Sequence, residues 1–256
     1  MTDPADLTKD YLRDMAPAEV ASWYARLADF VEKKNSKVSN ALAPLFLRHY
    51  LKGGGKQLII DAPDHLKKSK YVSQVLGNHR AWYLTEKRFK NRWVGIVPRL
   101  QGAPPEWEPL ALPARTLDLN SLVEIEVKWL SEHTPGDSDL LTALHGFQLH
   151  SMVYFFFEKV PKTNKLRVVF TLFAARIDDR YDFDPDEYFP VPNPDYKNPL
   201  KISKPVAPAL ERMLVYHRNA KRMEKAGLAA PFDIKSYYWV DESLMSPAEI
   251  DPAKKL

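Results

Sequence analysis

Apolar residues recur every three or four positions in the first third of the chain, a spacing that predicts amphipathic helices. The clearest set follows Pro17 and comprises Val20, Trp23, Tyr24, Leu27, Phe30 and Val31. Further helices are expected from Asp3 to about Met15, from Ser36 to Tyr50 and from Asp64 to Lys90. Residues 1–91 are therefore predicted to form a helical N-terminal part.

The pattern changes to alternation further along the chain, which predicts strands. Leu122–Leu130 alternates apolar and charged residues, and Phe147–Glu158 and Leu166–Ile177 flank a turn at Pro161–Asn164. We predict that the last two segments form a long β-hairpin. Both faces of its strands are apolar in the middle, so both need cover, and the N-terminal helices are the obvious candidates.

The remaining segments complete a predicted α+β fold, with N-terminal helices packed on a mostly antiparallel sheet around the long central hairpin. Residues 92–256 are predicted to be a β-rich part with one C-terminal helix, sharing one core with residues 1–91. The other expected elements are strands at Leu58–Ile60, Trp93–Val97 and Phe232–Val240, extended or looped chain at Pro98–Arg115 and Asp178–Lys204, a helix at Pro205–Ala226 and a polar tail after Glu242.

Composition narrows the possible chemistry. The 256 residues include no cysteine, which excludes a disulfide framework, a Cys-ligated metal site and a Cys nucleophile. The formal net charge of +4 is mild and argues against nucleic acid as the partner. Only 9 residues are glycine, so the triplet Gly53–Gly55 stands out. A P-loop needs a preceding strand and a following Ser or Thr, and here Gln57 follows Lys56, so the triplet is interpreted as a helix stop.

The N-terminal residues Met1–Asp10 are acidic and polar, without the basic and apolar regions of a signal peptide. The most apolar run, Met152–Phe157, is much shorter than the roughly 20 residues of a membrane-spanning helix. We expect synthesis in the cytoplasm, and any export by a route without a cleaved signal. Contact with the envelope is compatible with this interpretation.

A run of carboxylates and aromatic residues follows the second hairpin strand, from Asp178 to Tyr188. Asp179 and Asp182 are candidate acid/base groups if their environments split their pKa values. Tyr181 lies between them as a candidate positioning residue. In the alternative, structural interpretation, Asp182 caps the following turn, while Tyr181 and Phe183 plug the edge of the sheet.

A divalent metal is an alternative cofactor for the same run. Asp182, Asp184 and Asp186 alternate as ligands do in an EF-hand loop, but Glu187 stands where that loop needs glycine. A site for Mg²⁺ or Ca²⁺ of another kind is therefore left as a hypothesis. The seven histidines show no metal-binding spacing.

Basic clusters occur at Lys67–Lys70, at Lys87–Arg92 and around Lys221, Arg222 and Lys225. The main interpretation is a solvated helix face, and contact with nucleic acid or anionic lipid is the alternative. Exposed aromatic residues would suit protein binding: Trp107, Tyr188, Tyr196, Tyr237, Tyr238 and Trp239.

Several short motifs occur together in a fixed order. They are Arg48–Lys56, Leu144–His150, Asp179–Phe183 and Phe232–Ser236. In this order they resemble an uncharacterised proteobacterial family often encoded beside type VI secretion or polymorphic-toxin components. The resemblance covers roughly residues 40–240. It implies an effector-like or secretion-associated protein.

A narrower resemblance is to the colicin M-type toxins, which cleave the lipid-linked peptidoglycan precursor. Their active-site pattern is Asp-x-Tyr-Asp followed by His-Arg, and Asp179, Tyr181 and Asp182 match its first half. The only His-Arg pair after the motif is His217–Arg218, on the predicted C-terminal helix. The resemblance therefore implies a catalytic set of Asp179, Tyr181, Asp182, His217 and Arg218.

Two classes of function follow from these observations. The first is a secretion-associated interbacterial effector, toxin-like, that hydrolyses a phosphodiester or a lipid-linked envelope precursor. The second is a non-catalytic adaptor, immunity or structural protein of a secretion system. A secretion-system or immunity protein is the partner that both classes imply, and the sequence leaves the oligomeric state open.

Overall fold

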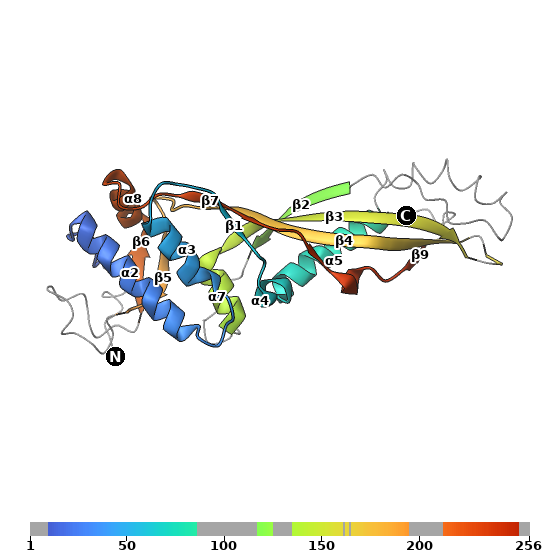
Figure 1. Ribbon diagram of the computed structural model, residues 1–256, viewed down its shortest axis with the longest axis horizontal. Coiled ribbons are helices and arrows are strands. Elements are labelled where there is room, and N and C mark those ends of the chain that lie inside the picture. Colours follow the sequence, from blue (N-terminus) through green and yellow to red (C-terminus); the bar gives the residue numbers. More distant parts are fainter. Residues whose placement is uncertain are drawn as a thin grey trace. The chain divides into compact units, whose positions relative to one another are not determined.

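The computed structural model describes residues 10–85, 117–124, 135–160, 162–163, 165–194 and 212–250, and these form an α+β fold, as predicted (Figure 1). The helices are α2 (Pro17–Lys34), α3 (Leu42–Leu51), α4 (Asp64–Lys67), α5 (Lys70–Thr85), α7 (Pro135–Ala143), α8 (His217–Lys225) and the 3-10 helix Glu242–Leu244. The strands are β1 (Leu58–Ile60), β2 (Leu117–Glu124), β3 (Gly146–Lys159), β4 (Leu166–Tyr181), β5 (Tyr188–Pro192), β6 (Arg212–Tyr216), β7 (Phe232–Ser236), β8 (Trp239–Val240) and β9 (Ala248–Ile250). None of the helices in these ranges has the length and apolar character needed to cross a bilayer.

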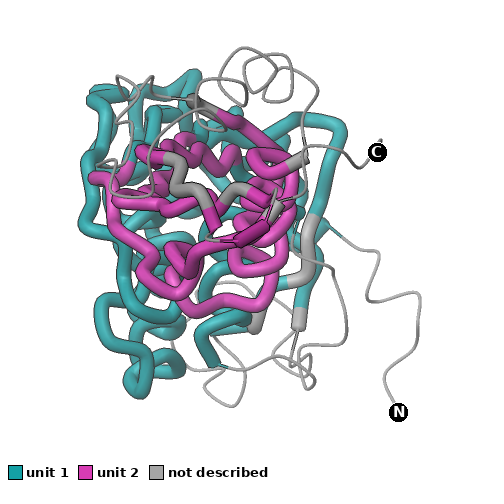
Figure 2. Tube along the Cα trace, turned by 90° about the vertical axis from the view of Figure 1, so that its right-hand side faces the viewer, with its two compact units in different colours: residues 1–66, 124–147, 179–235 teal, residues 67–123, 148–178, 236–256 magenta. Residues whose placement is uncertain are grey.

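The chain divides into two compact units whose segments alternate along the sequence (Figure 2). Unit 1 comprises residues 1–66, 124–147 and 179–235, and unit 2 comprises residues 67–123, 148–178 and 236–256. The larger sheet has the strand order β1-β7-β4-β3-β2, with β8 and β9 also paired to β4, and β5 and β6 form a second sheet. The predicted boundary between residues 91 and 92 lies outside the described residues.

The core of unit 1 is built from the predicted stripe of α2 and from aromatic side chains of α3. Val20, Trp23, Tyr24, Leu27 and Val31 of α2 are buried, as their spacing predicts. Burying each such side chain contributes about 1.5–3 kcal/mol. The α3 residues Phe46 and Tyr50 are also buried, and their rings meet those of β4 and β7 edge to face.

The N-terminus of α3 is capped by a carboxylate from a distant helix. Asp139 of α7 is fully buried and accepts hydrogen bonds from the backbone amides of Leu42 (2.7 Å) and Ala43 (3.1 Å). It also accepts one from the side chain of Asn35 (3.0 Å) and lies 3.0 Å from His65 Nε2. A carboxylate at a helix N-terminus is stabilised by the exposed amides and the helix dipole. We therefore assign Asp139 a structural role.

The C-terminus of α3 ends as the glycine triplet predicts. Gly53, Gly54 and Gly55 all have positive φ angles, of 69°, 85° and 60°. Residues that carry a side chain rarely adopt a positive φ angle, whereas glycine adopts it freely. The triplet therefore turns the chain out of α3 towards β1.

Unit 2 is built on the predicted hairpin. In it β3 pairs with β4 in antiparallel register, with Val153 opposite Phe173 and a β-bulge after Tyr154. One face of the hairpin is buried against α5. The ring of Tyr83 on α5 meets Phe173 edge to face at 6.0 Å, and the Tyr83 hydroxyl donates to the Ser151 carbonyl. Helix α5 belongs to the predicted N-terminal helical part, so on this face the expected helical cover is confirmed.

A buried polar network joins α5 to two strands of unit 2. His79 is almost fully buried, with Nδ1 2.7 Å from Ser151 Oγ and Nε2 2.8 Å from Ser121 Oγ. Burial, with a smaller contribution from the charge of His150, lowers the pKa of His79 to about 4. The imidazole is therefore neutral near pH 7, with one nitrogen donating and the other accepting.

The prediction was wrong in the region after β4. In the expected loop at 178–204, residues 178–181 belong to β4 and residues 188–192 form β5. In the described part of the expected helix at 205–226, residues 212–216 form β6 and His217–Lys225 are helical. Val215 of β6 pairs with Phe189 and Met213 pairs with Val191. Met213 and Val215 are buried while Leu214 and Tyr216 are half-buried, so the strand has the alternation that a helical spacing obscured.

Several boundaries also differ from the predicted ones. Residues 36–41 form turns before α3, Lys68 and Ser69 separate α4 from α5, and α7 was not predicted. The expected strand 232–240 is split by the exposed Tyr237 and Tyr238, and the tail contains β9. The expected elements Trp93–Val97 and Pro98–Arg115, and residues 86–90 and 125–130 of two others, lie outside the described residues.

Candidate functional site

The predicted acidic motif lies at the end of β4 and in the turn after it, within unit 1. Because side chains alternate along a strand, Asp179 and Tyr181 point to one side of β4 and Arg180 to the other. Tyr181 is buried and Asp179 half-buried, whereas Arg180 and Asp182 are exposed. The motif therefore divides its side chains between core and solvent.

Tyr181 is a core residue of unit 1. Its ring stacks on Phe232 at 5.2 Å and meets Phe46, Tyr50 and Phe183 edge to face at 5.9, 5.9 and 5.5 Å. Burial raises the pKa of its hydroxyl well above the usual range. Packing in the core of unit 1 accounts for Tyr181 and Phe183, and Tyr181 fixes the backbone between the two carboxylates.

Asp179 is a carboxyl group that burial pushes towards its neutral form. Burial, with a further contribution from the charge of Asp182, raises its pKa to about 7, although a hydrogen bond from the Arg180 backbone amide opposes the shift. Within the described residues Asp179 forms no ion pair. Near pH 7 it therefore exchanges a proton readily with its surroundings.

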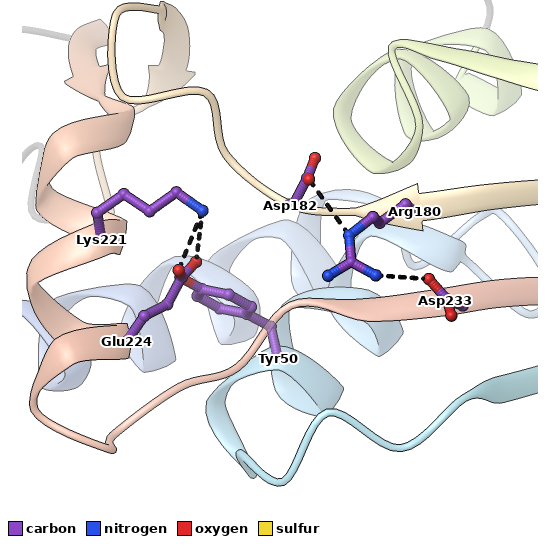
Figure 3. Close-up of polar contacts among 6 residues, drawn as sticks. All are labelled: Tyr50, Arg180, Asp182, Lys221, Glu224 and Asp233. Atoms are coloured by element: carbon purple, nitrogen blue, oxygen red, sulfur yellow. Dashed lines mark hydrogen bonds and ion pairs between the residues drawn. The ribbon is translucent and has the colours of Figure 1, made fainter.

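Asp182 lies in the opposite environment, at the surface. Arg180 Nε lies 3.5 Å from Asp182 Oδ2, and Arg180 Nη1 lies 2.8 Å from Asp233 Oδ1 on β7 (Figure 3). The side chains of Arg180, Asp182 and Asp233 are each at least half exposed, so these ion pairs contribute little to stability. Their effect is to hold a solvated carboxylate three residues from a buried one.

The β5–β6 pairing brings His217 to this region. Tyr188 pairs with Tyr216, so the neighbouring residues Glu187 and His217 meet at the end of the ladder. The His217 backbone amide donates to the Glu187 carbonyl (3.0 Å), and His217 Nδ1 lies 3.8 Å from Glu187 Oε2. The imidazole also meets the Phe183 ring edge to face at 5.0 Å.

His217 is held mainly in the neutral form. Burial lowers its pKa and the charge of His145 adds to this effect, while Glu187 and a backbone hydrogen bond at Asp184 oppose it. His217 thus lies beside the residues that follow Asp182, although 30 or more positions separate them in sequence. Sequence reasoning missed the contacts of Glu187 and Asp184, because the β5–β6 pairing that creates them was not predicted.

Arg218 points to a different set of groups. Its guanidinium forms an ion pair with the nearly buried carboxylate of Asp10 (2.7 Å) and lies over the Tyr216 ring at 4.4 Å. These contacts place Arg218 at the N-terminal segment of unit 1. Of the predicted catalytic set, Asp179, Tyr181 and Asp182 are contiguous, His217 lies next to Phe183, and Arg218 faces Asp10.

The predicted metal ligands lie at the surface. Asp184 Oδ1 accepts a hydrogen bond from the Asp186 backbone amide (3.0 Å), which closes a tight turn, and Asp182 pairs with Arg180. Nowhere in the described ranges do three His, Cys, Asp or Glu side chains gather as metal ligands. The arrangement of Asp182, Asp184 and Asp186 is explained by turn formation and ion pairing, and a Mg²⁺ or Ca²⁺ site there stays a prediction.

The predicted aromatic surface is partly present. Tyr188, Tyr237 and Tyr238 are exposed, whereas Trp239 is only 8% exposed. The inclusion of Trp239 in an exposed surface was therefore wrong: it pairs with Ala175 of β4 and packs into unit 2. Trp107 and Tyr196 lie outside the described residues.

Comparison with family models, with curated proteins and with solved structures finds no match to this chain. In unit 1, a half-buried carboxyl, an exposed carboxylate and a neutral histidine occur on neighbouring segments.

Proposed function

We propose that this chain is a secretion-associated, toxin-like effector that hydrolyses a phosphodiester or a lipid-linked envelope precursor. The observation that supports this proposal is the contrast between Asp179, whose pKa is raised to about 7, and the solvated Asp182. Two carboxyl groups in different environments are the usual means of providing an acid and a base at one pH.

Each carboxyl has a defined role in the proposed reaction. Ionised Asp182 accepts a proton from water as the water oxygen forms a bond to phosphorus. As the bond between phosphorus and the leaving oxygen breaks, neutral Asp179 donates its proton to that oxygen. The proton on Asp182 then returns to Asp179 through solvent, so the cycle neither gains nor loses protons.

The other predicted residues support this pair. Tyr181 keeps Asp179 and Asp182 in place through the aromatic packing of unit 1. Neutral His217, beside Glu187, is a positioning residue for the 183–187 segment. Arg218 is the exception: it pairs with Asp10, and no part in hydrolysis is assigned to it.

The test is expression of the chain in the bacterial cytoplasm and, separately, with export to the periplasm. We expect growth arrest or lysis in one compartment, and loss of the effect in Asp179→Asn. Asp178→Asn is the matched control, because Asp178 is the preceding carboxylate but is paired with His150 (3.0 Å) and Arg176 (3.1 Å). Circular dichroism checks that all variants fold.

Two outcomes would reject the proposal in different ways. Absence of arrest and lysis in both compartments would exclude a toxin. Toxicity that survives the double variant Asp179→Asn with Asp182→Asn would exclude this site while leaving a toxin elsewhere in the chain.

Hydrolysis of bis(p-nitrophenyl) phosphate by the purified chain gives a second readout. Because Asp179 acts as the acid, kcat/KM should fall as the pH rises through about 7, where that group loses its proton. A rate that keeps rising with pH through this range would contradict the assigned role.

A non-catalytic adaptor, immunity or structural protein is the second candidate. The exposed side chains of Tyr188, Tyr237 and Tyr238 favour it, because aromatic residues are enriched at protein interfaces. A stoichiometric partner recovered without toxicity in either compartment would support this candidate over the first.

A further inference from the structure

A cationic cleft of about 430 Å³ lies beside α8 in unit 1. Its lining residues are Arg13, Pro185, Arg218, Asn219, Lys221, Arg222 and Lys225. Five of the seven carry a positive charge, whereas the whole chain has a net charge of only +4. The cleft therefore concentrates positive charge at one place.

The spacing of residues on α8 explains this face. Arg218, Lys221, Arg222 and Lys225 are separated by three or four positions, so they share one side of the helix. Ala220 and Met223 lie on the other side and are fully buried. The helix is thus attached to unit 1 by its apolar side and presents its basic side to the cleft.

The wall opposite α8 is fixed by hydrogen bonds to the N-terminal segment. Arg222 Nη1 donates to the carbonyls of Leu12 (3.2 Å) and Arg13 (2.8 Å), and Nη2 donates to that of Met15. The Asp10 carboxylate binds both Arg218 Nε (2.8 Å) and Asn219 Nδ2 (2.8 Å). These contacts position the Arg13 side chain beside α8 before any ligand arrives.

Only part of the positive charge is neutralised within the protein. Asp10 pairs with Arg218, and Glu224 pairs with Lys221 at 3.0 Å while accepting a hydrogen bond from Tyr50 (Figure 3). Five cationic side chains and two paired carboxylates leave an excess of three positive charges. Arg13 and Lys225 are exposed, with no ion pair to any part of the chain that the structure describes.

We propose that this cleft binds a small ligand through two or more linked phosphoryl groups. An excess of three charges matches a di- or triphosphate, and arginine and lysine are the side chains that bind phosphoryl oxygens best. A cleft of this volume is in the range that holds a small molecule. The inference concerns binding alone and is independent of hydrolysis at Asp179 and Asp182.

The surroundings disfavour an extended polyanion such as nucleic acid. Pro185 lines the cleft, and its neighbours Asp184 and Asp186 are both exposed carboxylates. Phosphates that continued past Pro185 would meet these negative charges. The positive charge is therefore confined to the cleft and suits a compact anion.

The test is titration calorimetry of the full chain with inorganic pyrophosphate and with inorganic tripolyphosphate, at low and at physiological salt. We expect saturable binding, with a Kd that the double variant Arg13→Gln with Lys225→Gln raises about tenfold or more. Lys34→Gln, an exposed lysine of α2 outside the cleft, is the matched control and should leave Kd unchanged.

Further arms identify the source of the phosphoryl groups. A nucleoside diphosphate represents a soluble ligand, and phosphatidylcholine vesicles containing a lipid diphosphate represent a membrane ligand. In either case soluble pyrophosphate should compete. The proposal is overturned if pyrophosphate does not bind, if the cleft variant and the Lys34→Gln control bind equally, or if a short DNA duplex binds more tightly than tripolyphosphate.

Hydrolysis and binding fail separately in this design. Asp179→Asn should retain pyrophosphate binding whether or not it is toxic, because Asp179 does not line the cleft. Loss of pyrophosphate binding in Asp179→Asn, with the fold intact, would contradict the independence of the two sites.

Discussion

His79 in unit 2, which is buried, and Asp179 in unit 1, which is half-buried, respond to the same physical effect in different surroundings. Burial disfavours the charged form of each, so the pKa of His79 falls to about 4 and the pKa of Asp179 rises to about 7. His79 is held by hydroxyl groups on both sides, from Ser151 and Ser121. Asp179 has a hydrogen bond from the Arg180 backbone amide and the unfavourable charge of Asp182.

The difference indicates which group is structural and which is poised to react. A neutral histidine with both nitrogens hydrogen-bonded has a settled protonation state near pH 7 and stabilises the fold. A carboxyl whose pKa is close to the working pH, beside a solvated carboxylate, exchanges its proton easily. Burial thus accounts for both the raised and the lowered pKa. The hydrogen-bond partners determine whether the group is structural or poised to react.

The largest expected effect concerns Asp179 and pH. Its pKa is higher in the folded state (about 7) than in the unfolded chain (about 3.9), so its stabilising contribution is complete below about pH 4 and is lost as the pH rises to about 7. Asp179→Asn removes this loss. In urea unfolding, the free energy of unfolding of the variant should exceed that of the wild type by up to about 4 kcal/mol near pH 8. The two values should match near pH 4.

The control for this experiment is Asp178→Asn, which removes a carboxylate paired with His150 and Arg176. It should not stabilise the protein at high pH. An Asp179→Asn difference that is the same at both pH values would show that folding does not raise the pKa of Asp179.

The second prediction breaks the network of unit 2. His79→Ala leaves a cavity and deprives the buried Ser151 hydroxyl of a partner, so it should lower the free energy of unfolding by about 3 kcal/mol at neutral pH. Ser121→Ala removes the other, less buried hydroxyl and should cost about 1 kcal/mol. Equal effects of the two substitutions would contradict the structural role assigned to His79.

The smallest expected effect is at Asp182. Its ion pair with Arg180 is exposed, so Asp182→Asn should change the free energy of unfolding by less than about 0.5 kcal/mol. The same variant should lose toxicity and hydrolysis. If Asp182→Asn instead lost much stability and kept its activity, Asp182 would be a structural residue and not the proposed base.

The fold was largely predictable where local pattern and tertiary packing agree. The three- and four-residue spacing on α2 identifies its buried face correctly, and the two apolar segments on either side of a turn identify the β3–β4 hairpin. Between Met213 and Tyr216 the apolar spacing suits a helix as well as a strand. Pairing with the distant residues 188–192 decides for the strand, and a local pattern does not contain that information.

The candidate site was predictable in composition and only partly in geometry. That Asp179 and Asp182 lie near the end of a strand could be read from the sequence, although β4 extends to Tyr181 and so includes Asp179. The burial of Asp179 could not, because the core around Tyr181 is completed by Phe46 and Phe232, which come from distant segments. One wall of the cationic cleft could be recognised in the sequence from the spacing of the basic residues on α8. The other wall comes from residues 10–15.

If Asp179 is the acid of the proposed reaction, it must be protonated to a large extent at neutral pH. Titration of the side-chain carboxyl carbons by NMR, with Asp179→Asn used to assign the signal, tests it directly. The account predicts a midpoint near pH 7 for Asp179. A midpoint near the ordinary value of about 4 would contradict the account and remove the proposed acid.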